Sequence, residues 1–194
     1  MVVASSSGAA RSIPIAESVP LPNGYPGPSA LANVLSLAGA AQSQQRPIRI
    51  PALGLTLVVR LSPDVFGGAA SVIETVHAPG FGPPLHRHPE TEVFRVLRGR
   101  YVMQMDDELI ELAEGDVVTV PGGVAHAFVN VSEEDASQWV LMTPGMQADV
   151  FFGELSQLMR KGPPERAALD AFGRKWGVEF LGPPLRADVV GALF

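Results

Sequence analysis

The chain has 194 residues, of which 46% are hydrophobic and 18% are charged, which is enough for one globular domain with a sizeable core and short for two. It contains no cysteine, so disulfides, thiolate metal sites and cysteine nucleophiles are excluded. The net charge of −6 argues against binding to a phosphate backbone, so we expect no nucleic-acid partner. Neither a secretory signal nor an apolar run of bilayer-spanning length is present, so we expect a cytoplasmic protein with no membrane partner.

Residues 1–46 consist largely of Ser, Ala, Pro and Gly, a composition that cannot form a core by itself. We expect a low-complexity N-terminal arm that is partly disordered. It contains one local helix signal, because Ser29 is a good N-cap and Gly39 a good stop. The face of this short helix would carry Leu31, Val34, Leu35 and Ala38.

Residues 47–148 have the pattern of an all-β barrel, because short apolar or alternating runs recur between clusters of turn residues. Eight strands are expected, at Leu55–Leu61, Ser71–His77, Glu92–Leu97, Tyr101–Met105, Glu108–Leu112, Val117–Val120, Val124–Val131 and Gln138–Met142. At least eight strands at this spacing favour a sandwich or closed barrel over alternating strands and helices.

Residues 149–194 have helical periodicity, and we expect a C-terminal helical extension that packs on the barrel. The apolar face of the first helix carries Phe151, Leu155, Leu158 and Met159. That of the second carries Leu169, Phe172 and Trp176, and Gly177 is its expected C-cap.

Four residues form a candidate site for one divalent transition metal ion. His86, His88 and Glu92 stand at positions i, i+2 and i+6, which project from one face if the segment is a strand. His126 comes from a later strand, and antiparallel closure would bring it opposite. Three imidazoles and one carboxylate suit Fe, Mn, Ni, Co, Zn or Cu, and they leave coordination positions open for a substrate.

The residues around these ligands resemble the two signature motifs of the cupin superfamily. The first motif reads Gly80-x5-His86-Arg87-His88-x3-Glu92-x6-Gly99. The second reads Gly115-x5-Pro121-Gly122-Gly123-x2-His126-x3-Asn130. The segment from Trp176 to Leu185 is also similar to the tail of small bacterial cupins that are often labelled quercetin dioxygenase-like.

The resemblance implies a double-stranded β-helix, or jelly-roll barrel, with the metal inside its mouth. It also implies turn conformations at Gly99 and Gly115 that are costly for other residues, and a turn held by Asn130. Five residues are expected to line the pocket: Phe94, Val96, Met103, Met105 and Phe128.

Two further polar residues are assigned ordinary roles. His77, at a strand end and outside both motifs, is expected at the surface or in a loop. Glu90 is expected to be solvated, because the spacing to Gly99 favours Glu92 as the ligand.

Membership of this superfamily identifies the site better than the reaction. We expect an O2-dependent dioxygenase acting on a phenolic or enolic small molecule, with Glu92 as both ligand and catalytic base. The alternatives are a metal-dependent isomerase, decarboxylase or lyase that is indifferent to oxygen, and a cupin that binds a small ligand without turnover. We also expect a homodimer, because Leu55–Leu61 is apolar enough to need a neighbouring strand and residues 29–50 could contribute an arm.

Overall fold

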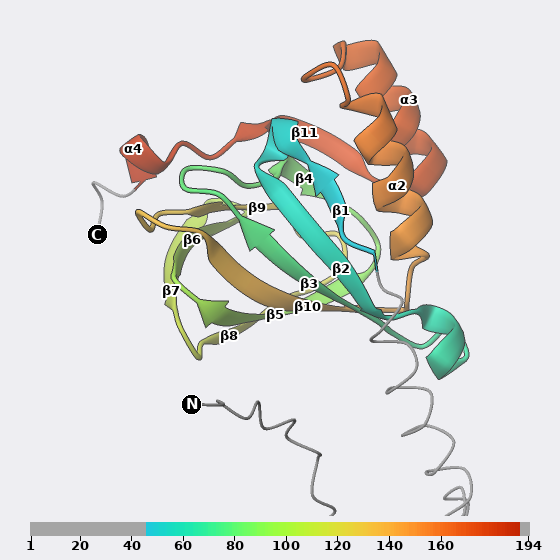
Figure 1. Ribbon diagram of the computed structural model, residues 1–194, viewed down its shortest axis with the longest axis horizontal. Helices are drawn as coiled ribbons and strands as arrows, with labels where there is room; N and C mark the ends of the chain where they lie inside the picture. Colours follow the sequence, from blue (N-terminus) through green and yellow to red (C-terminus); the bar gives the residue numbers. More distant parts are fainter. Residues whose placement is uncertain (1–45, 191–194) are drawn as a thin grey trace, which may run out of the picture. The chain divides into compact units, whose positions relative to one another are not determined.

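The computed structural model describes residues 46–190, which form two facing antiparallel sheets (Figure 1). The six-stranded sheet has the order β1 (Ile48–Ile50), β2 (Leu55–Leu61), β3 (Ser71–His77), β10 (Ala136–Thr143), β5 (Thr91–Arg98) and β8 (Val117–Val120). The five-stranded sheet has the order β11 (Glu179–Pro184), β4 (Pro84–Arg87), β9 (His126–Asn130), β6 (Arg100–Met105) and β7 (Glu108–Ala113). The predicted all-β jelly-roll barrel with C-terminal helices is confirmed. The predicted N-terminal arm, with its helix near Ser29, lies almost entirely outside the described residues.

All eight strands expected from the sequence are present, with ends that shift by at most two residues. The reason is visible in β10, where buried and more exposed residues alternate along the whole strand. Ala136, Gln138, Val140 and Met142 face the interior, while Trp139 and Leu141 face outward. An alternating strand at a two-sided sheet is the pattern that periodicity detects best.

The sequence analysis missed three strands, β1, β4 and β11. β1 has only three residues, and β4 and β11 contain proline or glycine, which local patterns assign to turns. β11 lies within the predicted C-terminal helical extension, yet it pairs with β4 at the edge of the five-stranded sheet. The C-terminal part of the chain therefore completes the barrel as well as packing on it.

β2 is an internal strand, with β1 on one side and β3 on the other. The apolar run Leu55–Leu61 thus has both neighbours within its own chain, which removes the argument that it needs a second subunit. The homodimer stays a prediction.

Two helices lie side by side at one end of the barrel, next to β1 and β11 (Figure 1). They are α2 (Ala148–Leu158) and α3 (Arg166–Trp176), and α3 ends at Gly177 in the left-handed conformation, with φ of 71°. Phe151 packs against Phe172 and Trp176 of α3, with ring centroids 5.2 and 5.4 Å apart. Glu154 of α2 links the helices by accepting hydrogen bonds from Lys175 Nζ and Trp176 Nε1.

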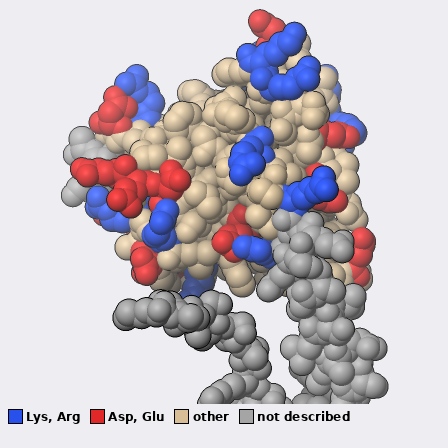
Figure 2. Space-filling model, viewed as in Figure 1, with Lys and Arg blue, Asp and Glu red and all other residues tan. Residues whose placement is uncertain are grey.

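Short helical turns complete the described fold: η1 (Pro51–Leu53), η2 (Pro63–Phe66) and α4 (Ala187–Val190). Val190 of α4 packs on Val102 and Val129 of the five-stranded sheet. Within residues 46–190, no helix is both long and apolar enough to cross a membrane. The face shown in Figure 2 carries acidic and basic side chains interspersed, with uncharged surface between them.

Candidate metal centre

The imidazoles of His86, His88 and His126 converge, with one ring nitrogen of each within 4.8 Å of the others. His86 lies on β4 and His88 follows it directly, while His126 is the first residue of β9. Antiparallel pairing of β4 with β9 sets His86 opposite His126, as the sequence analysis expected. The three side chains are thus positioned to bind a metal ion.

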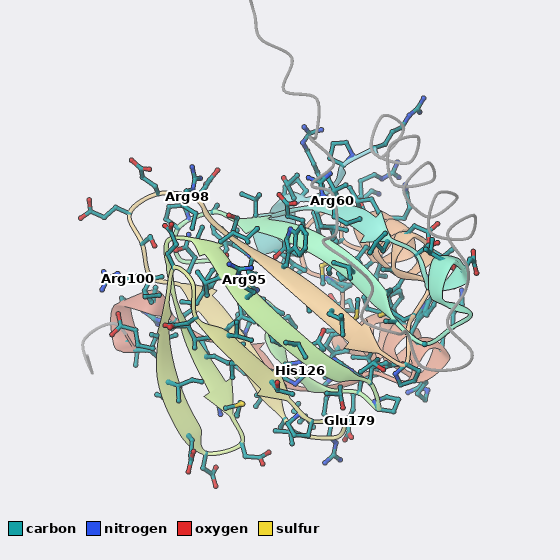
Figure 3. The ribbon with its side chains drawn as sticks, turned by 90° about the horizontal axis from the view of Figure 1, so that it is seen from below. Arg60, Arg95, Arg98, Arg100, His126 and Glu179 are labelled. Carbon is teal, nitrogen blue, oxygen red and sulfur yellow. The ribbon has the colours of Figure 1, made fainter. Side chains whose placement is uncertain are left out.

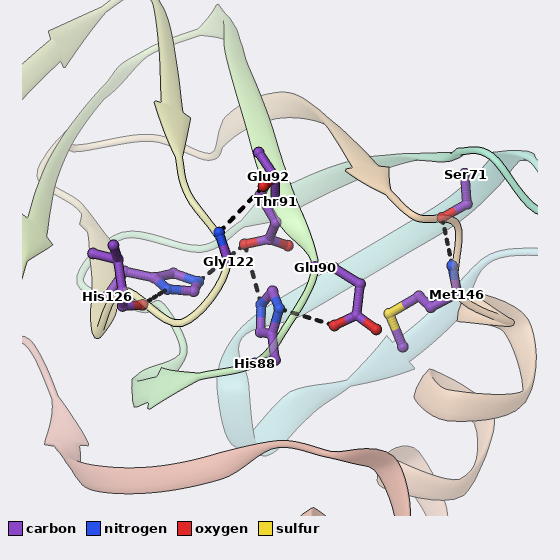
Figure 4. Close-up of polar contacts among 9 residues, drawn as sticks. Ser71, His88, Glu90, Thr91, Glu92, Gly122, His126 and Met146 are labelled. Atoms are coloured by element: carbon purple, nitrogen blue, oxygen red, sulfur yellow. Dashed lines mark hydrogen bonds and ion pairs between the residues drawn. The ribbon is translucent and has the colours of Figure 1, made fainter.

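Glu92 joins this group from the other sheet. Its Oε2 lies 3.0 Å from His126 Nε2 and 3.5 Å from His88 Nε2 (Figure 4). The spacing predicted that His86, His88 and Glu92 share one face of a single strand. That prediction is wrong, because β4 ends at Arg87 and Glu92 lies on β5. The chain leaves the five-stranded sheet after Arg87 and enters the six-stranded sheet at Thr91, so a turn between sheets brings the carboxylate to the imidazoles.

The donor set fits a divalent metal ion. His86 Nδ1 lies 2.8 Å from the carbonyl oxygen of Pro84, and His126 Nδ1 lies 3.0 Å from that of Val124. Each carbonyl accepts a hydrogen bond from the Nδ1–H, which leaves the Nε2 lone pair free to bind a metal. In His126 this lone pair faces the Glu92 carboxylate, and two electron-rich atoms 3.0 Å apart need a cation or a shared proton between them.

Burial and contacts set the charge of the site. Burial lowers the pKa of His86 to about 3, so its imidazole is neutral at physiological pH. Burial alone would raise the pKa of Glu92, but its contacts with His126 and His88 outweigh burial and hold that pKa well below its usual range. Burial opposes charge on His88 too, but the contacts with Glu92 and Glu90 raise its pKa above the ordinary value.

Glu90 is part of the site, contrary to the prediction that it is solvated. Its Oε2 lies 3.1 Å from His88 Nδ1, and its side chain is 19% exposed. The contact lacks the geometry of a hydrogen bond, because Nδ1 has no such partner among the described residues, and it becomes an ion pair when the ring is protonated. His88 is therefore held between two carboxylates, Glu92 at one ring nitrogen and Glu90 at the other (Figure 4).

The turn at residues 121–123 packs closely against the segment 88–91 beside the ligands. A Cβ added at Gly122 would lie 2.0 Å from the carbonyl oxygen of Pro89, so only glycine allows this close approach. Gly123 donates a backbone hydrogen bond to the His88 carbonyl, and Gly122 donates one to Thr91 Oγ1. The Pro121-Gly122-Gly123 turn thus fixes the segment that carries His88.

The conformational roles implied for other motif residues are confirmed. Gly99 and Gly115 have φ of 83° and 95°, in the region that favours glycine. Asn130 is buried and bonds to backbone on three sides, donating to the carbonyls of His77 and Glu134 and accepting from the Ser132 amide. Arg95 is exposed on the outer face of β5, while His126 is buried between the sheets (Figure 3).

A cavity of about 110 Å³ opens beside the ligands and extends under α2 and α3. Its walls are mainly aliphatic and aromatic. The polar side chains among the described lining residues are Thr75, His77, His86, His88, Glu90 and Glu92. The helices supply Phe151, Phe152, Leu155 and Trp176. The sequence analysis had assigned Phe151, Leu155 and Trp176 only to packing and had given Phe152 no role.

The five predicted pocket residues divide into two groups. Phe94 and Phe128 line the cavity. Val96, Met103 and Met105 are not among its lining residues, because they pack into the barrel core with Tyr101 and Leu112. Val96 and Met103 are fully enclosed, so they leave no free surface for a ligand, whereas Met105 pairs with His126 in the ladder of β6 and β9 and packs against the core from there.

His77 is buried, contrary to the surface position expected for it. It is 2% exposed and lies on the inward face of β3 with Ser71, Ile73 and Thr75. The alternation of this strand carries the signal that was overlooked, because His77 is in phase with the three inward residues.

Comparisons with known proteins support the same family. Residues 73–143 match the family model of the cupin domain. Uncharacterised proteins of Streptomyces coelicolor and Methanocaldococcus jannaschii are 43% identical over 47 residues and 30% identical over 73 residues, or 24% and 37% of this chain. These stretches cover 45% and 58% of the two relatives, so the chain spans about half of their length. The structure of a predicted oxalate decarboxylase from Thermotoga maritima is similar with a TM-score of 0.49 and 22% identity, over 52% of this chain and 94% of that one.

The family match runs from β3 to β10 and therefore includes both motifs and all the candidate ligands. The two facing sheets, the two glycine-bearing motif turns and the converging histidines are the features that the resemblance implied. The segment from Ile73 to Thr143 is therefore a cupin domain.

Proposed function

We propose that this cupin holds one divalent transition metal ion on His86, His88, His126 and Glu92, and that it is an O2-dependent dioxygenase acting on a phenolic or enolic small molecule. One observation carries the proposal. The imidazoles of His86, His88 and His126 and the carboxylate of Glu92 converge beside a cavity whose walls are mainly aliphatic and aromatic.

A bound ion of this type would polarise a phenol or enol oxygen and provide a place for O2 beside it. Glu92 is ionised at neutral pH and lies at the cavity wall, so it is placed to accept the proton that such a substrate releases. Phe94, Phe128 and the side chains of α2 exclude water from this reaction space.

The cavity favours a neutral, flat substrate over an anionic one. None of the described residues that line it is lysine or arginine, so a phosphate or a second carboxylate would be buried without a counter-charge. Six aromatic side chains stand among these residues, namely Phe94, Phe128, Phe151, Phe152, Trp176 and Phe180. Aromatic walls pack well against a planar ring.

Metal content and oxygen uptake test the proposal together. Tag-free protein is analysed by mass spectrometry for metals, beside His126→Ala and, as a control, Arg95→Ala on the outer face of β5. We expect nearly one iron, nickel, manganese or copper ion per chain in the parent and the control, and little in His126→Ala. Oxygen consumption should then follow addition of phenolic or enolic compounds to the loaded parent.

Other results would contradict the proposal at different levels. Turnover that continues without oxygen would replace the dioxygenase with a non-redox isomerase, decarboxylase or lyase. Zinc as the only metal would favour that reading too. If neither parent nor control bound metal even after reconstitution, the metal centre itself would be refuted.

A further inference from the structure

His77 forms a second polar group in the cavity, apart from the candidate metal ligands. Its ring packs edge-on against Phe128, with centroids 5.0 Å apart, and Phe128 in turn contacts Phe94 at 5.6 Å. Phe94 in turn lies near His126, with ring centroids 6.4 Å apart. A chain of ring contacts thus runs from His77 through Phe128 and Phe94 to His126, and His77 lines the same cavity as the candidate ligands His86, His88 and Glu92.

The partner of His77 fixes which nitrogen carries the hydrogen. His77 Nδ1 lies 3.2 Å from the hydroxyl of Tyr101, and this is the only hydrogen-bond partner of that hydroxyl among the described residues. Tyr101 is completely buried, so its O–H must donate to Nδ1 or lose a hydrogen bond. Nδ1 is then the acceptor, and in the neutral ring Nε2 carries the hydrogen.

The Nε2–H of His77 is an unused donor. Among residues 46–190 it has no hydrogen-bond partner. It is also absent from the fully inaccessible polar atoms that lack a partner, so a small molecule in the cavity can reach it. Burial lowers the pKa of His77 to about 3, so the ring stays neutral and Nε2–H keeps its donor character at physiological pH. Burying a donor without a partner is costly, and a ligand in the cavity would remove that cost.

We propose that His77 is a second substrate-binding residue, whose Nε2–H donates a hydrogen bond to an acceptor oxygen on the part of the substrate that lies away from the metal. This inference rests on the proposed function, because it assumes that the phenolic or enolic end of the substrate binds at the metal centre. It narrows the substrate class to an apolar phenol or enol that carries one further ether, carbonyl or hydroxyl oxygen. A phenol with a purely hydrocarbon body would leave Nε2–H unpaired.

Pairs of catechols that differ by one atom test this directly. 4-Butylcatechol and 4-(2-methoxyethyl)catechol have equal numbers of heavy atoms, and one CH2 of the first is an ether oxygen in the second. Propyl and pentyl catechols with their ether analogues vary the reach of the oxygen. Affinities are measured by calorimetry, without oxygen, on the full chain loaded with Zn(II), so no turnover is needed.

We expect the best ether to bind the parent about three- to tenfold more tightly than its alkyl analogue, the range of one buried hydrogen bond. His77→Leu should abolish this preference while binding the alkyl catechols within about twofold of the parent. Tyr101→Phe, which frees Nδ1 but keeps the rings, should weaken the preference. If the leucine variant does not fold, His77→Phe, which also removes the donor but keeps an aromatic ring, takes its place with the same expected loss of preference.

Each outcome decides between the two proposals. If no catechol binds the zinc-loaded parent, the proposed function fails and the role of His77 fails with it. If catechols bind but alkyl and ether forms are equal for all tails, or if the ether preference persists in His77→Leu, only the role of His77 is overturned.

Discussion

Glu90→Gln is the most informative single change, because it replaces one carboxylate oxygen beside His88 and leaves every candidate ligand intact. In the structure Glu90 Oε2 lies 3.1 Å from His88 Nδ1, the nitrogen that does not face the metal centre. A carboxylate in this position orients the imidazole and makes its other nitrogen a stronger ligand. We therefore expect Glu90→Gln to weaken metal binding without abolishing it.

The expected loss at pH 8 is about 10- to 100-fold in metal affinity, or about 1.4 to 2.7 kcal/mol, which is typical of a lost partner to a metal-bound histidine. The loss should be smaller at pH 6. Glu92 and Glu90 together raise the pKa of His88 in the metal-free protein, so a proton competes with the metal there. Removing the charge of Glu90 lowers the pKa of His88 and reduces this competition. At pH 6 the reduced competition therefore offsets part of the variant's loss of metal affinity.

Calorimetric titration with Ni(II) at pH 6, 7 and 8 measures both effects. Glu108→Gln is the matched control, because Glu108 is an exposed glutamate of β7 and the change removes the same unit of charge. Equal affinity of Glu90→Gln and the parent at pH 8, or an equal loss in Glu108→Gln, would refute the assigned role of Glu90. A loss that grows towards pH 6 would refute the account of proton competition.

Three further predictions concern stability. Gly122→Ala places a Cβ 2.0 Å from the Pro89 carbonyl oxygen and should lower the free energy of unfolding, measured in urea, by about 1–3 kcal/mol. Gly153→Ala in α2, which has open space around it, should be neutral or stabilising, and equal effects of the two changes would contradict the assigned close packing. Because the pKa of His77 is about 3 in the folded protein, the unfolded chain binds more protons between pH 6.5 and 3, and the free energy of unfolding decreases as the pH is lowered through that window. His77→Gln should reduce this slope by up to about 1.4 kcal/mol per pH unit in metal-free protein, and an unchanged slope would argue against a buried neutral His77. Phe151→Ala should cost about 3–5 kcal/mol, because Phe151 joins α2 to α3 and to the barrel, and a cost below about 1 kcal/mol would show that the helices pack loosely.

Local pattern was enough to predict most of the barrel. β10 alternates along its whole length and β3 alternates from Ile73 to His77, because one face meets the core and the other is more exposed. β4 and β11 do not alternate in this way, and their prolines imitate a turn. They are strands because each pairs with the other, and β4 also with β9, which are contacts between residues far apart in the chain.

The candidate site shows the same division. Motif spacing identified His86, His88, Glu92 and His126, and the structure brings all four together. It gave the wrong physical reason for the first three, since a turn between the sheets joins them. Spacing allowed Glu90 to share the face of His88 but favoured Glu92 as the ligand, and it could not show that Glu90 contacts His88, because neighbours of a ligand in sequence can point either way after a turn.

The sequence by itself determined the fold class, the candidate metal ligands and the glycines that shape the motif turns, because each depends on residue type and short spacing. Only the tertiary structure decided what surrounds the ligands. The C-terminal helices cover the cavity, Glu90 turns inward, and His77 lines the cavity while its Nδ1 contacts the Tyr101 hydroxyl. These relations join residues from different sheets and helices, and closure of the barrel, rather than any local preference, brings them within contact distance.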